Sequence, residues 1–322
     1  MELDLYTIRK ETLAGGVTQS ELACLDGCPM KWNLRYNNLL QLRGAWSWQM
    51  AVGNAIHEFM RDRYRGLDAD TEKVRWPEIG EDVYRSNEWE MEYTFWNGVI
   101  VAMQRAYVRR YKEEETTMEY DIVEQIVSRE FMGFNLIGLI DGKGTCLVDS
   151  KQFIKDHKVT TRPDLMAPMG WDMMFQFMFY SWLCEPMLKG ETFDFILNVL
   201  RKPALRQTQR ESYEGFVRRC SLDIIKRPDF YFVREPRPIT RGAIRRFEEY
   251  VLKPKLQRLK LVRDYPELAY PIITVPDTNN CFSYNQLCEF YGICKNGWDI
   301  ESYEYTQRPA KHTELIGMKQ YK

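Results

Sequence analysis

Gly138-Leu139-Ile140-Asp141 and, shortly after it, Leu147-Val148-Asp149-Ser150-Lys151 are the segments that decide how this chain is interpreted. In both runs apolar residues lead to an aspartate, and Gly142-Lys143-Gly144 between them has the composition of a turn. We therefore predict a hairpin whose strands cover residues 131–141 and 146–153.

The predicted hairpin brings three charged side chains together. Residues two apart on a strand point to the same face, so Asp149 and Lys151 should project together, with Asp141 on the adjacent strand end. Carboxylates suit Mg²⁺ or Mn²⁺, which bind substrate phosphate and lower the pKa of a bound water. Lys151 would position that water or help to remove its proton. A hairpin salt bridge between Asp149 and Lys151 is the alternative, because Asp-x-Lys also occurs by chance.

The surrounding sequence has the pattern of an α/β protein. A strand over residues 121–128 precedes the hairpin and completes a three-stranded meander, and residues 192–201 form a further buried strand. Helical periodicity is predicted over residues 18–36, 46–66, 88–114 and 170–188, with amphipathic helices in residues 210–264. We therefore expect a central sheet flanked by helices.

Three polar residues on the predicted helices are candidates for the same site. His57 lies at the edge of an apolar stripe, and Gly53 one turn earlier leaves space over its imidazole. A lone histidine is often structural, but this one could also be a third metal ligand. Gln176 and Tyr180 share a helix face and could hydrogen-bond to Lys151, a phosphate or a base, although Tyr180 also suits the core.

Composition limits the class of protein. The chain has 322 residues, is 44% hydrophobic and 28% charged, and carries a net charge of −1. These values exclude disordered, collagen-like and membrane classes, and they require any surface for nucleic acid to be a local patch. The sequence shows no signal-peptide pattern, no apolar run of the roughly 20 residues of a membrane span, and no Walker motif. We expect a cytoplasmic protein without a helicase of its own.

The eight cysteines fall into two groups. Four are scattered through apolar surroundings and are predicted to be packing residues: Cys24, Cys146, Cys184 and Cys220. The other four lie near the two ends of the chain: Cys28, Cys281, Cys288 and Cys294. In a reducing compartment such a set is more typical of a metal site than of disulfides, and both iron–sulfur and zinc remain open.

The run ending at Asp141, taken with Asp149-Ser150-Lys151, resembles the PD-(D/E)XK motif of the RecB-type nucleases, a group that includes phage exonucleases and CRISPR-associated nucleases. Three further matches follow in the family's order. Cys28-Pro29 resembles the N-terminal Cys-Pro start, Gly53-Asn54-Ala55-Ile56-His57 the histidine motif, and Gln176-Phe177-Met178-Phe179-Tyr180 the Gln-x-x-x-Tyr helix. The matches span residues 28–294.

The resemblance implies a fold and a set of ligands. The fold would be α/β and restriction-endonuclease-like, with a central mixed β-sheet, a helical insertion and a metal-cluster staple joining the termini. Mg²⁺ or Mn²⁺ would be bound by His57, Asp141, Asp149 and the Ser150 carbonyl. Lys151 would activate water, aided by Gln176 and Tyr180, and Glu124 would support the ligands from behind.

The resemblance also implies a role for the four terminal cysteines. Cys28 and the Cys281, Cys288 and Cys294 trio would hold a [4Fe–4S] cluster, with Zn²⁺ as the rival metal. The spacing Cys-x6-Cys-x5-Cys departs from the family's usual Cys-x2-Cys-x5-Cys, which bears on Cys281. The implied organisation is an N-terminal segment (1–40), a helical segment with the histidine (41–118), the nuclease core (119–210) and a C-terminal helical and cluster region (211–322).

The function implied is hydrolysis of DNA. We expect an exonuclease on single-stranded or end-exposed DNA in recombination, repair or phage DNA metabolism, with a helicase or recombinase as partner. A structure-specific endonuclease and a non-catalytic iron–sulfur subunit that binds nucleic acid are the alternatives. The phosphates would meet a basic groove, for which the candidates are Arg105, Arg109, Arg201, Lys202, Arg206 and Arg245.

Overall fold

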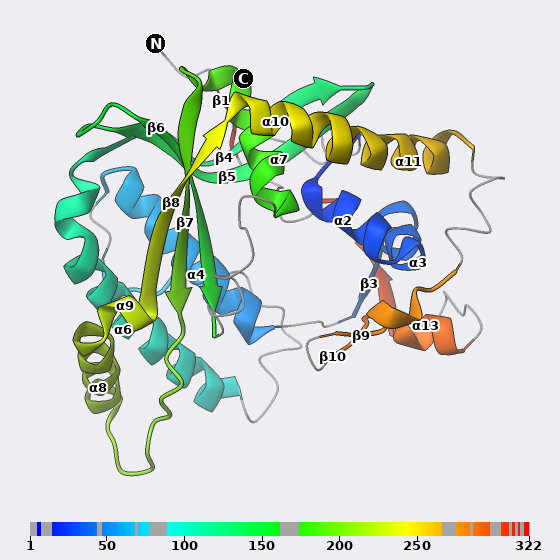
Figure 1. Cartoon of the computed structure of the whole chain (residues 1–322). Coiled ribbons are helices and arrows are strands. Elements are labelled where there is room, and N and C mark those ends of the chain that lie inside the picture. Colours follow the sequence, from blue (N-terminus) through cyan, green and yellow to red (C-terminus); the bar gives the residue numbers. More distant parts are fainter. Residues whose placement is uncertain are drawn as a thin grey trace.

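A computed structural model describes residues 5–7, 15–43, 47–67, 70–76, 89–161, 174–265, 275–283, 286–296 and 304–308, together with 311, 312, 315 and 319–321. A central sheet runs through the molecule and carries helices on both faces (Figure 1). Its strands lie in the order β1-β12-β4-β5-β6-β7-β8, and β2 also pairs with β5.

The sheet is mixed. β4 (Met118–Phe131), β5 (Phe134–Cys146) and β6 (Gln152–Thr160) form an antiparallel meander. β7 (Thr192–Arg201) is parallel to β6, and β8 (Phe232–Thr240) is antiparallel to β7. The remaining strands are short: β1 (Leu5–Thr7), β2 (Gly16–Val17) and β12 (Lys319–Tyr321). The predicted α/β class with a central mixed sheet is thus confirmed, but β8 shows that the sheet extends beyond residues 119–210.

The predicted position of the hairpin with strands over residues 131–141 and 146–153 was wrong. Gly142 and Gly144 do not form a turn; both lie inside β5 and pair with β4 and β6. The chain instead turns at residues 147–150, after the last β5–β6 pair, Thr145 with Gln152. Leu147 and Val148 look like strand residues because they are apolar, yet they are 58% and 77% exposed at this turn.

The two glycines are inside the strand because the neighbouring chain comes close there. A Cβ on Gly144 would overlap the carbonyl oxygen of Glu119, and one on Gly142 would lie 3.1 Å from the Tyr120 ring. Small residues therefore mark a close backbone approach here, which is the other reason for glycine in a strand.

Two layers of helices cover the sheet (Figure 1). One layer packs in the core around Val123, Leu200 and Phe232. It contains α4 (Trp48–Tyr64), α6 (Trp89–Glu115), α8 (Tyr213–Lys226) and α9 (Pro228–Tyr231). The other layer packs around Ile140, Ile154 and Phe195. It contains α2 (Gln19–Gly27), α7 (Phe175–Cys184), α10 (Arg241–Phe247) and α11 (Lys253–Asp264), with η5 (Glu248–Leu252) between the last two.

The helices predicted over residues 18–36, 46–66 and 88–114 are found at those positions, whereas the region 210–264, expected to be helical, also contains the strand β8. The Thr18 hydroxyl caps α2 by accepting from Glu21 N–H at 3.2 Å. After α2 the chain continues through α3 (Pro29–Trp32) and η1 (Asn33–Asn37), with a break at Cys28. Residues 170–173 of the predicted 170–188 helix lie outside the described residues.

A small region near the C-terminus packs beside α3. It contains η6 (Thr278–Asn280), β9 (Phe282–Ser283), β10 (Gln286–Leu287) and α13 (Tyr291–Lys295), and β11 (Tyr305–Gln307) pairs with β3 (Leu40–Leu42). η4 (Glu185–Met187) follows α7. Within the described parts of the chain, no helix is both long and apolar enough to cross a membrane.

Candidate metal centre

The candidate site lies where three strands of the meander stop pairing regularly. Between β4 and β5 the pairs Val123 with Gly142 and Gln125 with Ile140 flank an unpaired position occupied by Glu124 and Asp141. Between β5 and β6 pairing ends at Gly142 with Lys155, one residue before Asp141 and Asp156 would meet. Backbone register therefore sets Glu124 beside Asp141, and Asp156 is the next β6 residue in line with Asp141.

Backbone strain marks the same point. Glu124 has φ of 47°, in the left-handed region that a side chain other than glycine rarely adopts. Strain of this kind persists where the surrounding structure holds it, and it is concentrated at functional sites. Here it turns the Glu124 carboxylate toward the α4 side of the sheet.

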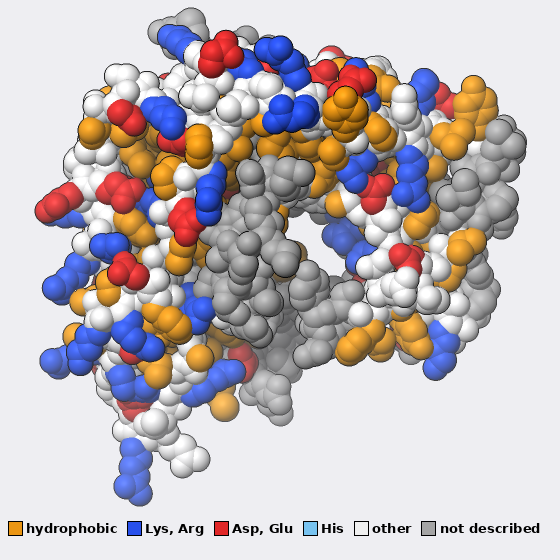
Figure 2. Space-filling view, viewed as in Figure 1, with side chains coloured by type: hydrophobic (Ala, Val, Ile, Leu, Met, Phe, Trp, Pro, Cys, Tyr) orange, Lys and Arg blue, Asp and Glu red, His pale blue; other side chains and the backbone are white. Residues whose placement is uncertain are grey.

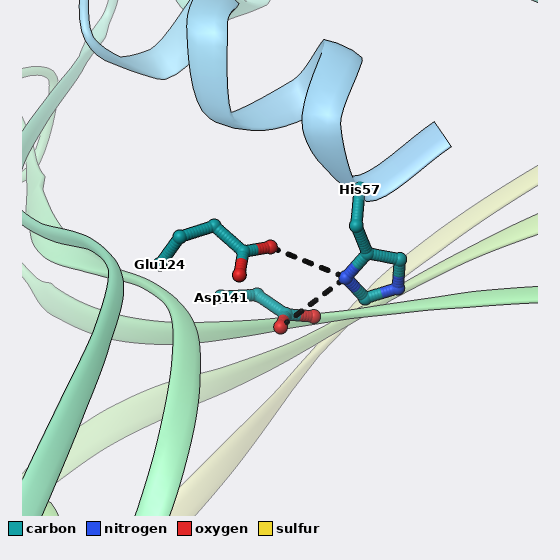
Figure 3. Close-up of side chains that lie close together, drawn as sticks. All are labelled: His57, Glu124 and Asp141. Atoms are coloured by element: carbon teal, nitrogen blue, oxygen red, sulfur yellow. Dashed lines mark hydrogen bonds and ion pairs between the residues drawn. The ribbon is translucent and has the colours of Figure 1, made fainter. Parts of the chain in front are cut away.

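His57 meets two of these carboxylates from α4 (Figure 3). Its Nδ1 lies 3.3 Å from Glu124 Oε1 and 3.4 Å from Asp141 Oδ1. The ligand atoms of the three residues all lie within 4.8 Å of one another. An imidazole with two carboxylates is a donor set that suits Mn²⁺, and the carboxylates suit Mg²⁺.

The electrostatics of the cluster fit a cation. Burial alone lowers the pKa of His57, but the neighbouring Asp141 and Glu124 outweigh it and raise the pKa well above 6.5. Burial raises the pKa of Asp141 while His57 lowers it, and the net pKa falls below the usual range. Burial raises the pKa of Glu124. The two buried carboxylates thus favour a positive charge beside them, which protonated His57 supplies in the metal-free protein and a bound divalent ion would supply in its place.

Asp141 is held in a defined orientation. Its Oδ2 accepts from the His157 backbone N–H at 2.7 Å, in place of the strand pairing that has ended, while Oδ1 faces His57. The carboxylate therefore presents one oxygen to the cluster and uses the other to hold β6.

Asp156 and Lys158 lie on β6, next to Asp141 of β5. Lys158 Nζ is 2.7 Å from Asp156 Oδ2, and Gln176 Nε2 donates to Asp156 Oδ1 at 3.4 Å. Burial raises the pKa of Asp156 to about 6, Lys158 lowers it, and the nearby Asp141 raises it further. Tyr180, one turn after Gln176 on α7, has a pKa raised by burial and by Asp156 and Asp141. Gln176 and Tyr180, for which Lys151 was one expected partner, thus lie near Asp156, and their roles in catalysis stay a prediction.

Asp149, Ser150 and Lys151 do not join this group. Asp149 and Ser150 are exposed in the β5–β6 turn, and Ser150 has φ of 58°. Lys151 pairs with Asp194 at 2.6 Å. Thr145, the last paired β5 residue before this turn, is four residues from Asp141, roughly 13 Å at strand rise. The expected convergence with Asp141 was therefore wrong, because the turn was assigned to the wrong residues.

The sequence contains the same pattern a second time, at residues that the strand register places beside Asp141. Asp156-His157-Lys158 has the same Asp-x-Lys pattern as Asp149-Ser150-Lys151. In a hairpin only residues equally far from the turn lie opposite each other, and a turn at 147–150 sets Asp141 opposite Asp156. Glu124, expected only to support the ligands, instead has an oxygen within the three-residue cluster.

The six basic residues expected to line one groove lie on different elements, and on the face shown in Figure 2 the Lys and Arg side chains are scattered among Asp and Glu. Arg105 and Arg109 lie on α6, whereas Arg245 lies on α10 in the other helix layer. Lys202 is 5% exposed and packs over Trp96, so it was wrong as a phosphate contact. Three of the other five contact neighbouring side chains: Arg105 pairs with Glu72, Arg201 lies over Phe230, and Arg206 lies over Phe95.

The four terminal cysteines, all among the described residues, lie in one region around α3 and α13, although no three of their thiols lie within 4.8 Å of one another. The Asp277 backbone N–H donates to Cys28 Sγ at 3.4 Å, and Cys288 N–H donates to the Cys281 carbonyl at 2.8 Å. Burial raises the pKa of Cys294 to about 11, and the Cys288, Cys28 and Cys281 thiols each raise it further. The two ends of the chain therefore place four sulfur ligands in one region, a donor set that suits iron–sulfur or zinc.

Comparison with known proteins agrees with this geometry. The family model of the PD-(D/E)XK nuclease superfamily matches residues 16–295, and the chain therefore belongs to that superfamily. As a member it is a nuclease, a hydrolase of phosphodiester bonds, and its α/β architecture is consistent with the restriction-endonuclease-like fold of the superfamily.

Comparison with solved structures and with curated proteins gives no further information on function. A solved structure from Eubacterium rectale, titled "Putative exonuclease", aligns with a TM-score of 0.44 and 12% identity over 89% of this chain and 90% of that one. No curated protein matches the sequence.

Proposed function

We propose that this nuclease cleaves DNA at a divalent-metal centre formed by His57, Glu124, Asp141 and Asp156, with Lys158 as the residue that positions the attacking water. The observation that carries the proposal is the convergence of α4, β4, β5, β6 and α7 at the point where strand pairing is interrupted. The motif then runs from Asp141 to Asp156-His157-Lys158, and the backbone carbonyl of His157 takes the place that was expected for Ser150.

Each residue of the centre would have a separate role in catalysis. Bound Mg²⁺ or Mn²⁺ would neutralise charge on the scissile phosphate and lower the pKa of a water. Asp141 is already oriented, because the His157 N–H fixes one of its oxygens. Lys158, next to Asp156, would hold the water or the phosphate by donating from its ammonium. Gln176 orients Asp156 from α7.

We propose an exonuclease acting on single-stranded or end-exposed DNA. The support is the resemblance to the RecB-type nucleases, and on the same ground we propose work beside a helicase or recombinase in DNA repair or recombination. An endonuclease would need the same centre. The test is cleavage of end-labelled single-stranded and double-stranded DNA beside a closed circle, with Mg²⁺ or Mn²⁺. Short products from linear DNA and an intact circle are expected, whereas a cleaved circle would establish an endonuclease.

We also propose that Cys28, Cys281, Cys288 and Cys294 bind a structural [4Fe–4S] cluster. The support is the mutual proximity of thiols from the two ends of the chain. The link would close a very long loop and so stabilise the fold by restricting the unfolded chain. Protein purified without oxygen should contain iron and sulfide, and Cys28→Ser should lose both, with Cys184→Ser as the buried control. One zinc per chain would replace iron in this proposal.

A further inference from the structure

Three buried polar residues form a ladder across the middle of the sheet. His157 on β6 is the registered partner of Asn198 on β7, and Asn198 is the registered partner of Arg234 on β8. We call these three residues the polar ladder. Their side chains are joined in the same order, with Arg234 Nε 3.1 Å from Asn198 Oδ1, and Asn198 Nδ2 2.8 Å from His157 Nδ1.

The ladder has a direction because guanidinium can only donate. Arg234 therefore fixes the Asn198 amide with its oxygen toward β8 and its NH₂ group toward β6. The NH₂ group donates to His157 Nδ1, so this nitrogen is the acceptor and carries no proton. The neutral imidazole must then carry its proton on Nε2.

The far end of the ladder is anchored. Arg234 pairs with Glu114, hydrogen-bonds to the Tyr107 hydroxyl, and stacks on the Tyr111 ring with its guanidinium carbon 3.6 Å from the centroid. An arginine held by a carboxylate and two tyrosines has little freedom to turn. The orientation of Asn198 is therefore set from outside the metal centre.

The near end of the ladder touches the metal centre twice. The His157 backbone N–H holds Asp141 Oδ2, and the His157 ring meets the His57 ring edge to face, with centroids 5.7 Å apart and planes at 84°. His157 is 1% exposed, and among the described residues its Nε2 has no hydrogen-bond partner. Rotation of the His157 ring would disturb the ring contact, and a shift of β6 at His157 would disturb the backbone bond to Asp141.

We propose that Asn198 and Arg234 are positioning residues of the nuclease: they hold the His157 ring in its Nε2-protonated tautomer, which fixes the plane of His57 for metal binding, and they anchor the part of β6 whose backbone N–H holds Asp141. The proposal rests on the proposed function, because it takes Asp141 and His57 as metal ligands. Apolar residues at the same three positions would pack a sheet as well, so a polar chain joined by hydrogen bonds from Arg234 to His157 points to orientation more than to stability.

The first test reads the tautomer directly. The chain contains three histidines, so ¹⁵N-histidine NMR of the metal-free protein can resolve each ring, with His157→Gln to assign the signal. His157 should be protonated at Nε2 only. In Asn198→Asp the carboxylate keeps the bond from Arg234 but cannot donate, so Nδ1 of His157 should become protonated. A wild-type His157 carrying a proton on Nδ1 would overturn the proposal.

The second test measures Mn²⁺ binding by calorimetry without any turnover. Because residues behind metal ligands typically change affinity by about 10-fold or more, Asn198→Asp should raise the Mn²⁺ dissociation constant about 10-fold. The matched control is Asn97→Asp on α6, since Asn97 also makes two side-chain hydrogen bonds, to Trp76 and Tyr213. The control should bind Mn²⁺ like the wild type.

The outcomes separate this proposal from the function on which it rests. An Asn198→Asp dissociation constant within about twofold of the wild type, at a temperature where both are folded, would show a merely structural ladder and overturn the proposal. Mn²⁺ binding by a wild type that cleaves no DNA would refute the proposed function alone. A wild type that binds no Mn²⁺ would refute both.

Discussion

Lys155, next to the proposed ligand Asp156, is buried without a carboxylate partner among the ion pairs of the described residues. Its Nζ donates to the Tyr120 hydroxyl at 2.6 Å and lies over the Tyr64 ring. Burial, with a further effect of Arg234, lowers the pKa of Lys155 well below 10.5. The folded protein therefore favours the neutral amine over a pH range in which the unfolded chain is protonated.

This pKa shift predicts a pH dependence of stability. Between the folded pKa of Lys155 and 10.5, unfolding takes up a proton, so the free energy of unfolding should rise with pH, by at most about 1.4 kcal/mol per pH unit. Lys155→Met lacks the group. Urea denaturation in EDTA at about pH 8 and about pH 10 should show the wild type gaining stability relative to the variant. Equal pH dependence of the two proteins would mean that Lys155 stays charged in the fold.

At the same scale, the sequence predicted some site residues and missed others for physical reasons. His57, Gln176 and Tyr180 lie on helices whose periodicity is visible, and their sides of the helix follow from it. Asp156 and Lys158 could be chosen over Asp149 and Lys151 only by knowing where the chain turns. The unusual φ of Glu124 arises from the β4–β5 register, which no local pattern encodes.

At the scale of elements, β5 depends on glycine. Gly144→Ala would force its Cβ onto the Glu119 carbonyl oxygen and within 2.9 Å of the Tyr120 Cα, which are backbone atoms that cannot move aside. We expect this variant to lose about 3 kcal/mol or more of stability, the upper range for overpacking.

Gly53→Ala is the control for this prediction. A Cβ there meets nothing within 4 Å, and the residue lies inside α4, so alanine should be neutral or add about 0.5–1 kcal/mol. Thermal or urea denaturation of both variants measures the difference. A Gly144→Ala protein as stable as the wild type would show that β4 and β5 are not as close as the structure has them.

The elements themselves could be predicted where periodicity is long. The strand over residues 192–201 and the helices over 46–66 and 88–114 match the structure closely. The β5–β6 hairpin could not be predicted in this way. Gly142 and Gly144 have the composition of a turn, but they lie inside a strand where β4 approaches β5 closely. Because the turn was misplaced, the next strand was predicted at residues 146–153, whereas β6 covers Gln152–Thr160. The motif was therefore assigned to Asp149 and Lys151 in place of Asp156 and Lys158.

At the scale of the whole molecule, one buried carboxylate joins distant parts of the chain. Glu21 on α2 is fully buried and contacts Arg263 of α11 at 3.0 Å and Lys311 near the C-terminus at 2.7 Å. It also accepts from Trp32 Nε1 at 3.2 Å. Such a hub fixes α2, α11 and the C-terminal segment together, which sequence patterns alone do not reveal.

Removing the hub should destabilise the protein strongly. Glu21→Ala leaves buried Lys311 and partly buried Arg263 without their carboxylate, and we expect a loss of about 3–5 kcal/mol. Glu289→Ala is the matched control, because Glu289 also joins two distant segments, through Lys31 and Arg35, but is partly exposed. The control should lose about 1 kcal/mol or less. Equal losses in urea denaturation would contradict the central place of Glu21.

The central claim is that Asp141 works with Asp156 and Lys158. It is tested most directly by the rate of Mg²⁺-dependent DNA cleavage in two pairs of variants, each confirmed to be folded: Asp156→Asn and Lys158→Ala against Asp149→Asn and Lys151→Ala. We predict that the first pair lose about 100-fold or more, because they remove a ligand and the water-positioning amine. The second pair, Asp149 in the exposed turn and half-buried Lys151 directly after it, should stay within about twofold of the wild type. Full activity in Asp156→Asn with loss of activity in Asp149→Asn would contradict the account.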